Sequence, residues 1–146
     1  MKSSSQSSSE KKIEKTKMSD EPYNKFRLLY ENHPLIHITI NFDGIITSIN
    51  KNGAKELGYL TNELIGSHLS ILFVPHDAAR LEKQIQYVLL NPDKQSPHEM
   101  KMLRKNKQEF WVRETIYTTN NSSLTKEIFF VFDNITFQKN AEAKAK

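Results

Sequence analysis

Near its C-terminal end the chain reads Lys126-Glu127-Ile128-Phe129-Phe130-Val131-Phe132-Asp133-Asn134-Ile135-Thr136. The five consecutive apolar residues of this stretch, 128–132, are all β-branched or aromatic, which favours a short strand over a helix. A strand with one face in water would alternate apolar and polar residues, and this one does not, so we expect both of its faces to be covered. The stretch therefore predicts the central strand of a sheet, and it leads directly into a polar, lysine-rich segment.

Two strands joined by a tight turn are predicted in the first half of the chain. Residues 36–42 alternate apolar and polar with a period of two, which indicates a half-buried strand. Asp43-Gly44 is a strong signal for a hairpin turn, and residues 45–49 return as the partner strand. Asn50 ends that strand, where its short amide side chain can bond nearby backbone as the chain enters a helix.

A helical insert follows this hairpin. Residues 51–59 form its first helix, with Ala54, Leu57 and Gly58 facing inward. Asp77 is the expected N-cap of the longest helix. The apolar residues of that helix recur at helical spacing and form one core-facing stripe, which consists of Ala78, Leu81, Ile85, Val88 and Leu89.

Two more strands complete the predicted sheet. Residues 98–105 form the first, Asn106-Lys107 makes a turn, and residues 110–119 form the second. The apolar residues that we assign to the second strand are Trp111, Val112, Ile116 and Tyr117. Five strands joined by hairpins around a helical insert imply an α+β domain with an antiparallel sheet whose one face the helices cover.

The chain is expected to hold one domain with tails. Residues 1–18 are a serine- and lysine-rich tail with too little apolar content to order itself. Residues 19–33 form an N-terminal amphipathic helix, residues 34–134 the α+β domain, and residues 135–146 the start of a C-terminal helix. The apolar stripe of the N-terminal helix either packs on the domain's own sheet or forms a homodimer face, and it consists of Tyr23, Phe26, Leu29 and Tyr30.

The charge distribution argues against nucleic-acid binding. Of the net charge of +4, residues 1–20 contribute five lysines against three acids, and residues 135–146 contribute three lysines against one acid. The folded part therefore balances to zero, whereas a nucleic-acid-binding domain usually has a basic face. No window is apolar enough for a membrane span or a secretory signal, so we expect a cytoplasmic protein.

Catalytic and metal-binding motifs are not found in the sequence. The four glycines are isolated, and no nucleophile elbow, Walker loop or dinucleotide fingerprint is present, so we do not expect an enzyme. The chain has no cysteine. The five histidines are scattered, and His33 and His37 are not expected to pair because Pro34 separates them and His37 begins a strand. We therefore predict no metal site.

The order of these motifs resembles that of the PAS sensor family from about Tyr23 to Lys139. The similar pieces are the first hairpin, a Leu-Gly-Tyr run followed by Glu-Leu-Ile-Gly, the Pro-His-Asp start of the long helix, the second hairpin, and the closing Asn-Ile-Thr run. The first hairpin occupies residues 42–46 and 49–50, the Leu-Gly-Tyr and Glu-Leu-Ile-Gly runs residues 56–59 and 63–66, and the start of the long helix residues 75–77. The second hairpin occupies residues 102–107 and 111–112, and the closing run residues 134–139. Two positions depart from the family pattern: Asn106-Lys107 replaces the usual Asp-Gly, and Asn134 replaces the usual aspartate.

The resemblance implies a PAS-like five-stranded sheet of order 2-1-5-4-3 and a sensory function. It also implies a homodimer and a downstream output such as a histidine kinase. The residues it assigns to structure and signalling are Asp43, Gly44, Asn50, Asn134, Ile135 and Thr136. Heme is not expected, because the long helix has no histidine several residues past its start. Cysteinyl-flavin chemistry is excluded because residues 66–70 contain no cysteine.

The interior between the sheet and the helices is the expected location of any ligand. We expect no tightly bound cofactor, but a small apolar or mixed-polarity molecule fits such a cleft. The alternative is a filled core, in which case the chain is a ligand-free scaffold for protein–protein interaction. The candidate lining residues are Ile38, Ile40, Leu57, Leu72, Leu81, Ile85, Met102, Val112 and Phe130.

Overall fold

A computed structural model describes residues 22–91, 97–118 and 126–145 of the chain. These residues fall into two compact units, one ending at Asn32 and the other beginning at His33. The predicted tail at residues 1–18 and the loop predicted at residues 120–124 lie outside the described residues. No helix among the described residues is long and apolar enough to cross a membrane.

The first unit contributes a helix over residues 22–31. Asn32 ends it: its backbone N–H and its side-chain amide both donate to the Leu28 carbonyl, at 3.1 and 2.9 Å. Tyr30 is half-buried. The exposed apolar side chains of this helix are Tyr23, Phe26, Leu28 and Leu29.

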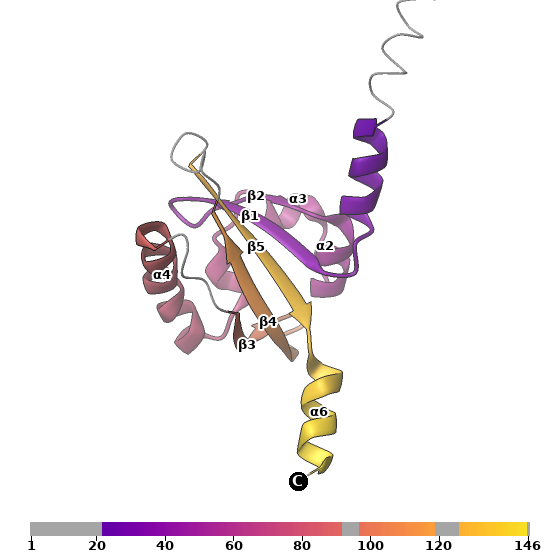
Figure 1. Cartoon of the computed structure of the whole chain (residues 1–146), viewed down its shortest axis with the longest axis vertical. Coiled ribbons are helices and arrows are strands. Elements are labelled where there is room, and N and C mark those ends of the chain that lie inside the picture. Colours follow the sequence, from indigo (N-terminus) through magenta and orange to yellow (C-terminus); the bar gives the residue numbers. More distant parts are fainter. Residues whose placement is uncertain (1–21, 92–96, 119–125, 146) are drawn as a thin grey trace, which may run out of the picture. The chain divides into compact units, whose positions relative to one another are not determined.

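The second unit is built on a five-stranded antiparallel sheet (Figure 1). Its order is β2-β1-β5-β4-β3, which confirms the predicted fold class. The strands are β1 (Ile36–Asn41), β2 (Ile46–Ile49), β3 (His98–Leu103), β4 (Glu109–Tyr117) and β5 (Glu127–Asn134).

Strand β5 lies in the middle of the sheet, as its apolar run predicts. Ile128, Phe130 and Phe132 are fully buried on one face. Phe129 and Val131 on the other face are only half-buried, so the prediction that both faces are covered is right for one face and only partly right for the other. An apolar run without alternation identifies a central strand here, but the helical insert covers only one of its faces.

The helical insert packs on that face (Figure 1). Gly58 is exposed rather than inward, because it ends the first helix with a φ of +83°, a conformation that glycine adopts without strain. Asp77 is not the N-cap of the long helix: Val74 holds that position, and Pro75 fills the first turn without needing a hydrogen-bond partner. The elements are α2 (Lys51–Leu57), α3 (Thr61–Leu64), the 3-10 helix η1 (Leu69–Leu72) and α4 (Pro75–Leu90).

Asn50 joins β1 to the start of α2. Its side-chain oxygen accepts from the His37 N–H at 3.0 Å, and its amide donates to the Leu35 carbonyl at 3.0 Å. The side chain is fully buried, so these bonds replace the water that its amide loses. They are the backbone bonds that the sequence predicts for this position.

The turn between β3 and β4 uses an unusual residue. Lys107 has a φ of +72°, in the region that favours glycine. The Asn106 side chain accepts from the Gln108 N–H at 2.9 Å, and the Arg104 N–H donates to the Gln108 carbonyl at 2.9 Å. The turn therefore closes without the Asp-Gly pair, with lysine taking the left-handed position.

Candidate functional site

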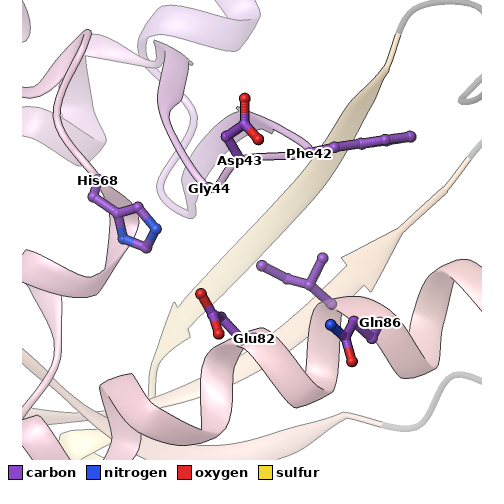
Figure 2. Close-up of a pocket in the computed structure, with 7 residues that line it drawn as sticks. Phe42, Asp43, Gly44, His68, Glu82 and Gln86 are labelled. Carbon is purple, nitrogen blue, oxygen red and sulfur yellow. The ribbon is translucent and has the colours of Figure 1, made fainter.

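A pocket of about 240 Å³ opens between the β1–β2 turn, the loop before η1 and the middle of α4. Figure 2 shows the His68 ring and the Glu82 carboxylate directed toward each other across it, whereas the Asp43 carboxylate is turned away from α4. The lining contains two acidic side chains and no lysine or arginine. It consists of Phe42, Asp43, Gly44, His68, Glu82, Ile85 and Gln86.

His68 is held in place by backbone pairing and by the absence of a side chain at Gly44. The Leu69 N–H donates to the Gly44 carbonyl at 2.8 Å, and the Ile46 N–H donates to the Ser67 carbonyl at 2.8 Å. A Cβ atom at Gly44 would lie 2.4 Å from His68 Nε2, and Gly44 itself has a φ of +83°. Only glycine therefore satisfies both the turn and the histidine that packs on it.

Hydrogen bonds from Ser70 determine which nitrogen of the His68 ring is the acceptor and which carries the proton. The Ser70 N–H donates to His68 Nδ1 at 3.1 Å, and the Ser70 hydroxyl lies 2.8 Å from the same atom. Nδ1 therefore acts as an acceptor, and Nε2, beside Gly44, carries the ring proton of the neutral imidazole. The pocket thus presents one histidine N–H together with acidic side chains.

A second feature of the interior is the carboxyl group of Glu114 on β4. Glu114 is fully buried, on the same face as Phe110, Val112 and Ile116. Neither of its oxygens has a hydrogen-bond partner among the described residues. Buried polar groups are nearly always paired, so an unpaired carboxyl in a core requires an explanation.

Burial raises the pKa of the Glu114 carboxyl to about 8, because the charged form loses its hydration. The Arg80 guanidinium on α4 opposes this rise in pKa, and the Asp77 carboxylate adds to it. Arg80 is itself paired with Asp77 at 3.8 Å, and its side chain is 62 % exposed. The carboxyl of Glu114 is therefore largely protonated near neutral pH.

The junction after β5 is a third site, and it contains the predicted signalling residues. The Asn134 amide donates to Glu56 Oε1 at 2.8 Å, and its side-chain oxygen accepts from the Thr136 N–H at 3.0 Å. Asn134 therefore caps the following helix α6 (Thr136–Ala145) and ties it to α2. Ile135 is buried, and its N–H donates to the Trp111 carbonyl at 2.9 Å.

The first turn of α6 is docked on the outer face of the sheet. Thr136 Oγ accepts from the Trp111 N–H at 3.1 Å. The Lys139 ammonium pairs with Glu99 on β3 and lies 5.0 Å from the centre of the Trp111 ring. The hydrogen bond between Lys139 and Glu99 lowers the pKa of Glu99 and raises the pKa of Lys139. The single tryptophan of the chain thus lies where β4 meets α6.

His33 and His37 lie next to each other, contrary to the prediction that they do not pair. His33 Nδ1 and His37 Nε2 lie 3.1 Å apart, and their rings meet edge to face at 4.8 Å. Pro34 does not separate them, because the chain turns there and brings His33 beside the start of β1. The pKa of His37 is lowered by burial and by repulsion from His33. Among the described residues, no three His, Asp or Glu side chains gather closely enough to hold a metal ion.

All nine candidate lining residues are buried in the core. Only Ile85 among them lines the described pocket, and contact of the others with a ligand stays a prediction. Sequence reasoning missed Glu82 and Gln86 as pocket residues, and it missed Glu114. The alternation Phe110, Val112, Glu114, Ile116 carries the signal for Glu114, because residues two apart on a strand share a face.

We expect Glu114→Gln to stabilise the protein increasingly as the pH rises. The folded-state pKa of Glu114, about 8, lies above the unfolded value near 4.3, so the wild type loses stability between these values. At ~1.4 kcal/mol per pH unit, the advantage of the variant should grow by about 3.5 kcal/mol between pH 5 and pH 8. Urea unfolding at both pH values measures it, with the exposed Glu109→Gln on the same strand as the control. If the free energy of unfolding changed with pH by the same amount in the wild type and in Glu114→Gln, this pKa would be wrong.

We expect Asn134→Asp to destabilise the junction at neutral pH. An aspartate keeps the cap on Thr136 but puts a carboxylate against Glu56, where the amide now donates a hydrogen bond. The expected cost is about 0.5–1 kcal/mol, because the pair is exposed. Glu56→Gln in the same chain should remove most of this cost in a double-mutant cycle. Equal stability of Asn134→Asp and wild type at pH 7 would show that the contact carries no energy.

Known proteins were compared with the chain by sequence and by structure. A family model described as PAS domain matches residues 34–137. No curated protein matches the chain significantly.

Solved PAS domains share the fold of the chain. The PAS domain of an HTR-like protein from Haloarcula marismortui superposes with a TM-score of 0.72 at 19 % identity, covering 84 % of this chain and 99 % of its own. A PAS domain from Colwellia psychrerythraea gives 0.69 at 17 % identity, covering 80 % and 98 %. The PAS domain of a LuxR-family transcriptional regulator from Burkholderia thailandensis, in complex with ethanol, gives 0.63 at 15 % identity, covering 75 % and 96 %. With a family model that covers most of the chain, these likenesses establish that the chain belongs to the PAS domain family.

Proposed function

We propose that this chain is a sensory module, which binds a small molecule between its sheet and its inserted helices and transmits a conformational change to α6. The observation that carries this proposal is the junction after β5. The same strand supplies Phe130 and Phe132 to the core and, two residues later, Asn134 to the cap of α6. A rearrangement of the core therefore has a short covalent and hydrogen-bonded route to the output helix.

The pocket beside α4 supports ligand binding. Its volume suits a small molecule, and the His68 N–H and the Glu82 carboxylate supply convergent polar groups. The Burkholderia thailandensis PAS domain was solved in complex with ethanol, which is also a small molecule. The expectation that no cofactor is tightly bound stays a prediction.

The output is proposed to be a separate domain or protein, such as a histidine kinase. A domain of a sensory box sensor histidine kinase/response regulator from Geobacter sulfurreducens shares the fold with a TM-score of 0.65 at 13 % identity, over 77 % of this chain. We propose no catalytic function for this chain. The cytoplasmic location expected from the sequence stays a prediction, as does the alternative of a ligand-free scaffold.

A ligand screen with two readouts tests the sensory proposal. Native mass spectrometry and an absorbance spectrum of the purified chain first identify any copurifying molecule. Small molecules are then screened by thermal shift, and binders are scored by Trp111 fluorescence. A ligand that raises the melting temperature should also change the emission of Trp111, because that ring is packed by Lys139 of α6. A chain without any binder would favour the ligand-free scaffold, and binding without a Trp111 response would overturn the relay.

We further propose a homodimer formed through the N-terminal helix. Phe26→Glu with Leu29→Glu should convert a dimer to a monomer, because these exposed apolar side chains lie on the predicted dimer face. Light scattering coupled to size-exclusion chromatography gives the mass, and Asn24→Glu with Lys25→Glu on the same helix is the matched control. A wild-type chain that is monomeric at high concentration would contradict this prediction.

A further inference from the structure

Glu114 is the one fully buried ionisable side chain among the described residues. Its two oxygens have no hydrogen-bond partner in that part of the chain. An apolar side chain at this position would continue the row formed by Phe110, Val112 and Ile116. A carboxyl in that row costs stability, so it points to a role beyond packing.

The charged groups that face Glu114 leave one negative charge unbalanced. From α4, Arg80 and Asp77 act on it, and they form a pair with each other. From β3, His98 is its cross-strand neighbour, but that side chain is exposed. From β5, the neighbour is Phe132, which carries no charge. An ionised Glu114 therefore matches a guest with a single positive charge.

Aromatic rings lie beside this carboxyl. Directly opposed residues of an antiparallel pair have Cβ atoms about 5 Å apart, and Phe132 opposes Glu114. The Phe132 ring stacks on Phe130 at 5.7 Å and meets Phe73 at 5.9 Å. A carboxylate on the same sheet face as a phenyl cluster is a combination suited to an ammonium group, through charge and through the ring quadrupole.

The described pocket beside α4, whose lining does not include Glu114, has the matching electrostatic sign. Asp43 and Glu82 line it, and none of its lining residues is lysine or arginine. Ile85 belongs to both the pocket lining and the core. Acidic walls raise the local concentration of cations, so a positively charged molecule is favoured at the surface as well as in the interior.

We propose that the ligand of this module is a small alkylamine, bound as its ammonium form against Glu114 between α4 and the β4–β5 pair. The inference rests on the proposed sensory function and adds the chemical class of the ligand. The ammonium group would donate to the free carboxylate oxygens, and the alkyl part would lie against the Phe73, Phe130 and Phe132 cluster. Binding against Phe132 would act directly on the strand that continues into α6.

The proposal carries its own pH dependence. An alkylammonium keeps its proton up to a pH near that of lysine, about 10.4, so it stays charged throughout the range. The empty site holds Glu114 protonated below about pH 8, and this proton must leave before the ammonium binds. Affinity should therefore rise about tenfold per pH unit between pH 6 and pH 8 and level off above, whereas a neutral ligand would show no such slope.

The test compares three probes of one size on the full chain: n-propylammonium chloride, 1-propanol and sodium propionate, with potassium chloride to match ionic strength. Titrations followed by thermal shift and by Trp111 fluorescence should rank propylammonium at least tenfold above the other two at pH 8. Glu114→Gln should abolish this ranking and its pH slope. Glu109→Gln, the same change at an exposed position of β4, should keep both.

Three outcomes would overturn the ligand class. They are an equal response to propanol, an equal response to potassium ion, and a preference for propylammonium that survives in Glu114→Gln. Glu114→Gln is expected to fold, because the amide is neutral at every pH and has nearly the shape of the protonated carboxyl, so loss of binding in this variant is not loss of structure. Binding of propanol alone would leave the sensory proposal intact and reject the amine, whereas no binder in the wider screen would reject the sensory proposal itself.

Discussion

The pairing of β5 with strands on both sides is the constraint on which the rest of the structure depends. Because β1 and β4 satisfy its backbone groups, β5 cannot shift without breaking two ladders at once. A one-residue slip would also move Ile128, Phe130 and Phe132 from the core to the outer face. Core, register and the exit point of the chain are therefore set by one strand.

The same constraint gives the inner face of the sheet its functional meaning. Residues on β4 and β5 that face the helices lie opposite each other across the ladder, and Glu114 lies opposite Phe132. A fully apolar row would pack better but would not respond to protons or to cations. The carboxyl makes this part of the core responsive to protons and to any cation that replaces them, at a cost in stability.

The fold was predictable because its signals are local. The Asp43-Gly44 turn, the alternation of β1 and the apolar run of β5 each follow from neighbouring residues. The site was predictable only in part, because it depends on residues far apart in sequence. The contact of His68 with Gly44, the pairing of His33 with His37 and the isolation of Glu114 all come from tertiary packing. The Asp77 cap failed for a local reason, since Pro75 had already begun the helix.

The docking of α6 has a mechanical consequence. The bonds described for it come from Asn134 and Ile135, which precede the helix, and from Thr136 and Lys139 in its first turn, and Phe137 is 86 % exposed. A helix of this length extends about 15 Å, so it acts as a lever whose fulcrum is the Trp111 contact. A tilt of roughly 10° at that fulcrum would sweep the far end through about 2–3 Å, which is enough to choose between alternative packings of whatever the helix meets.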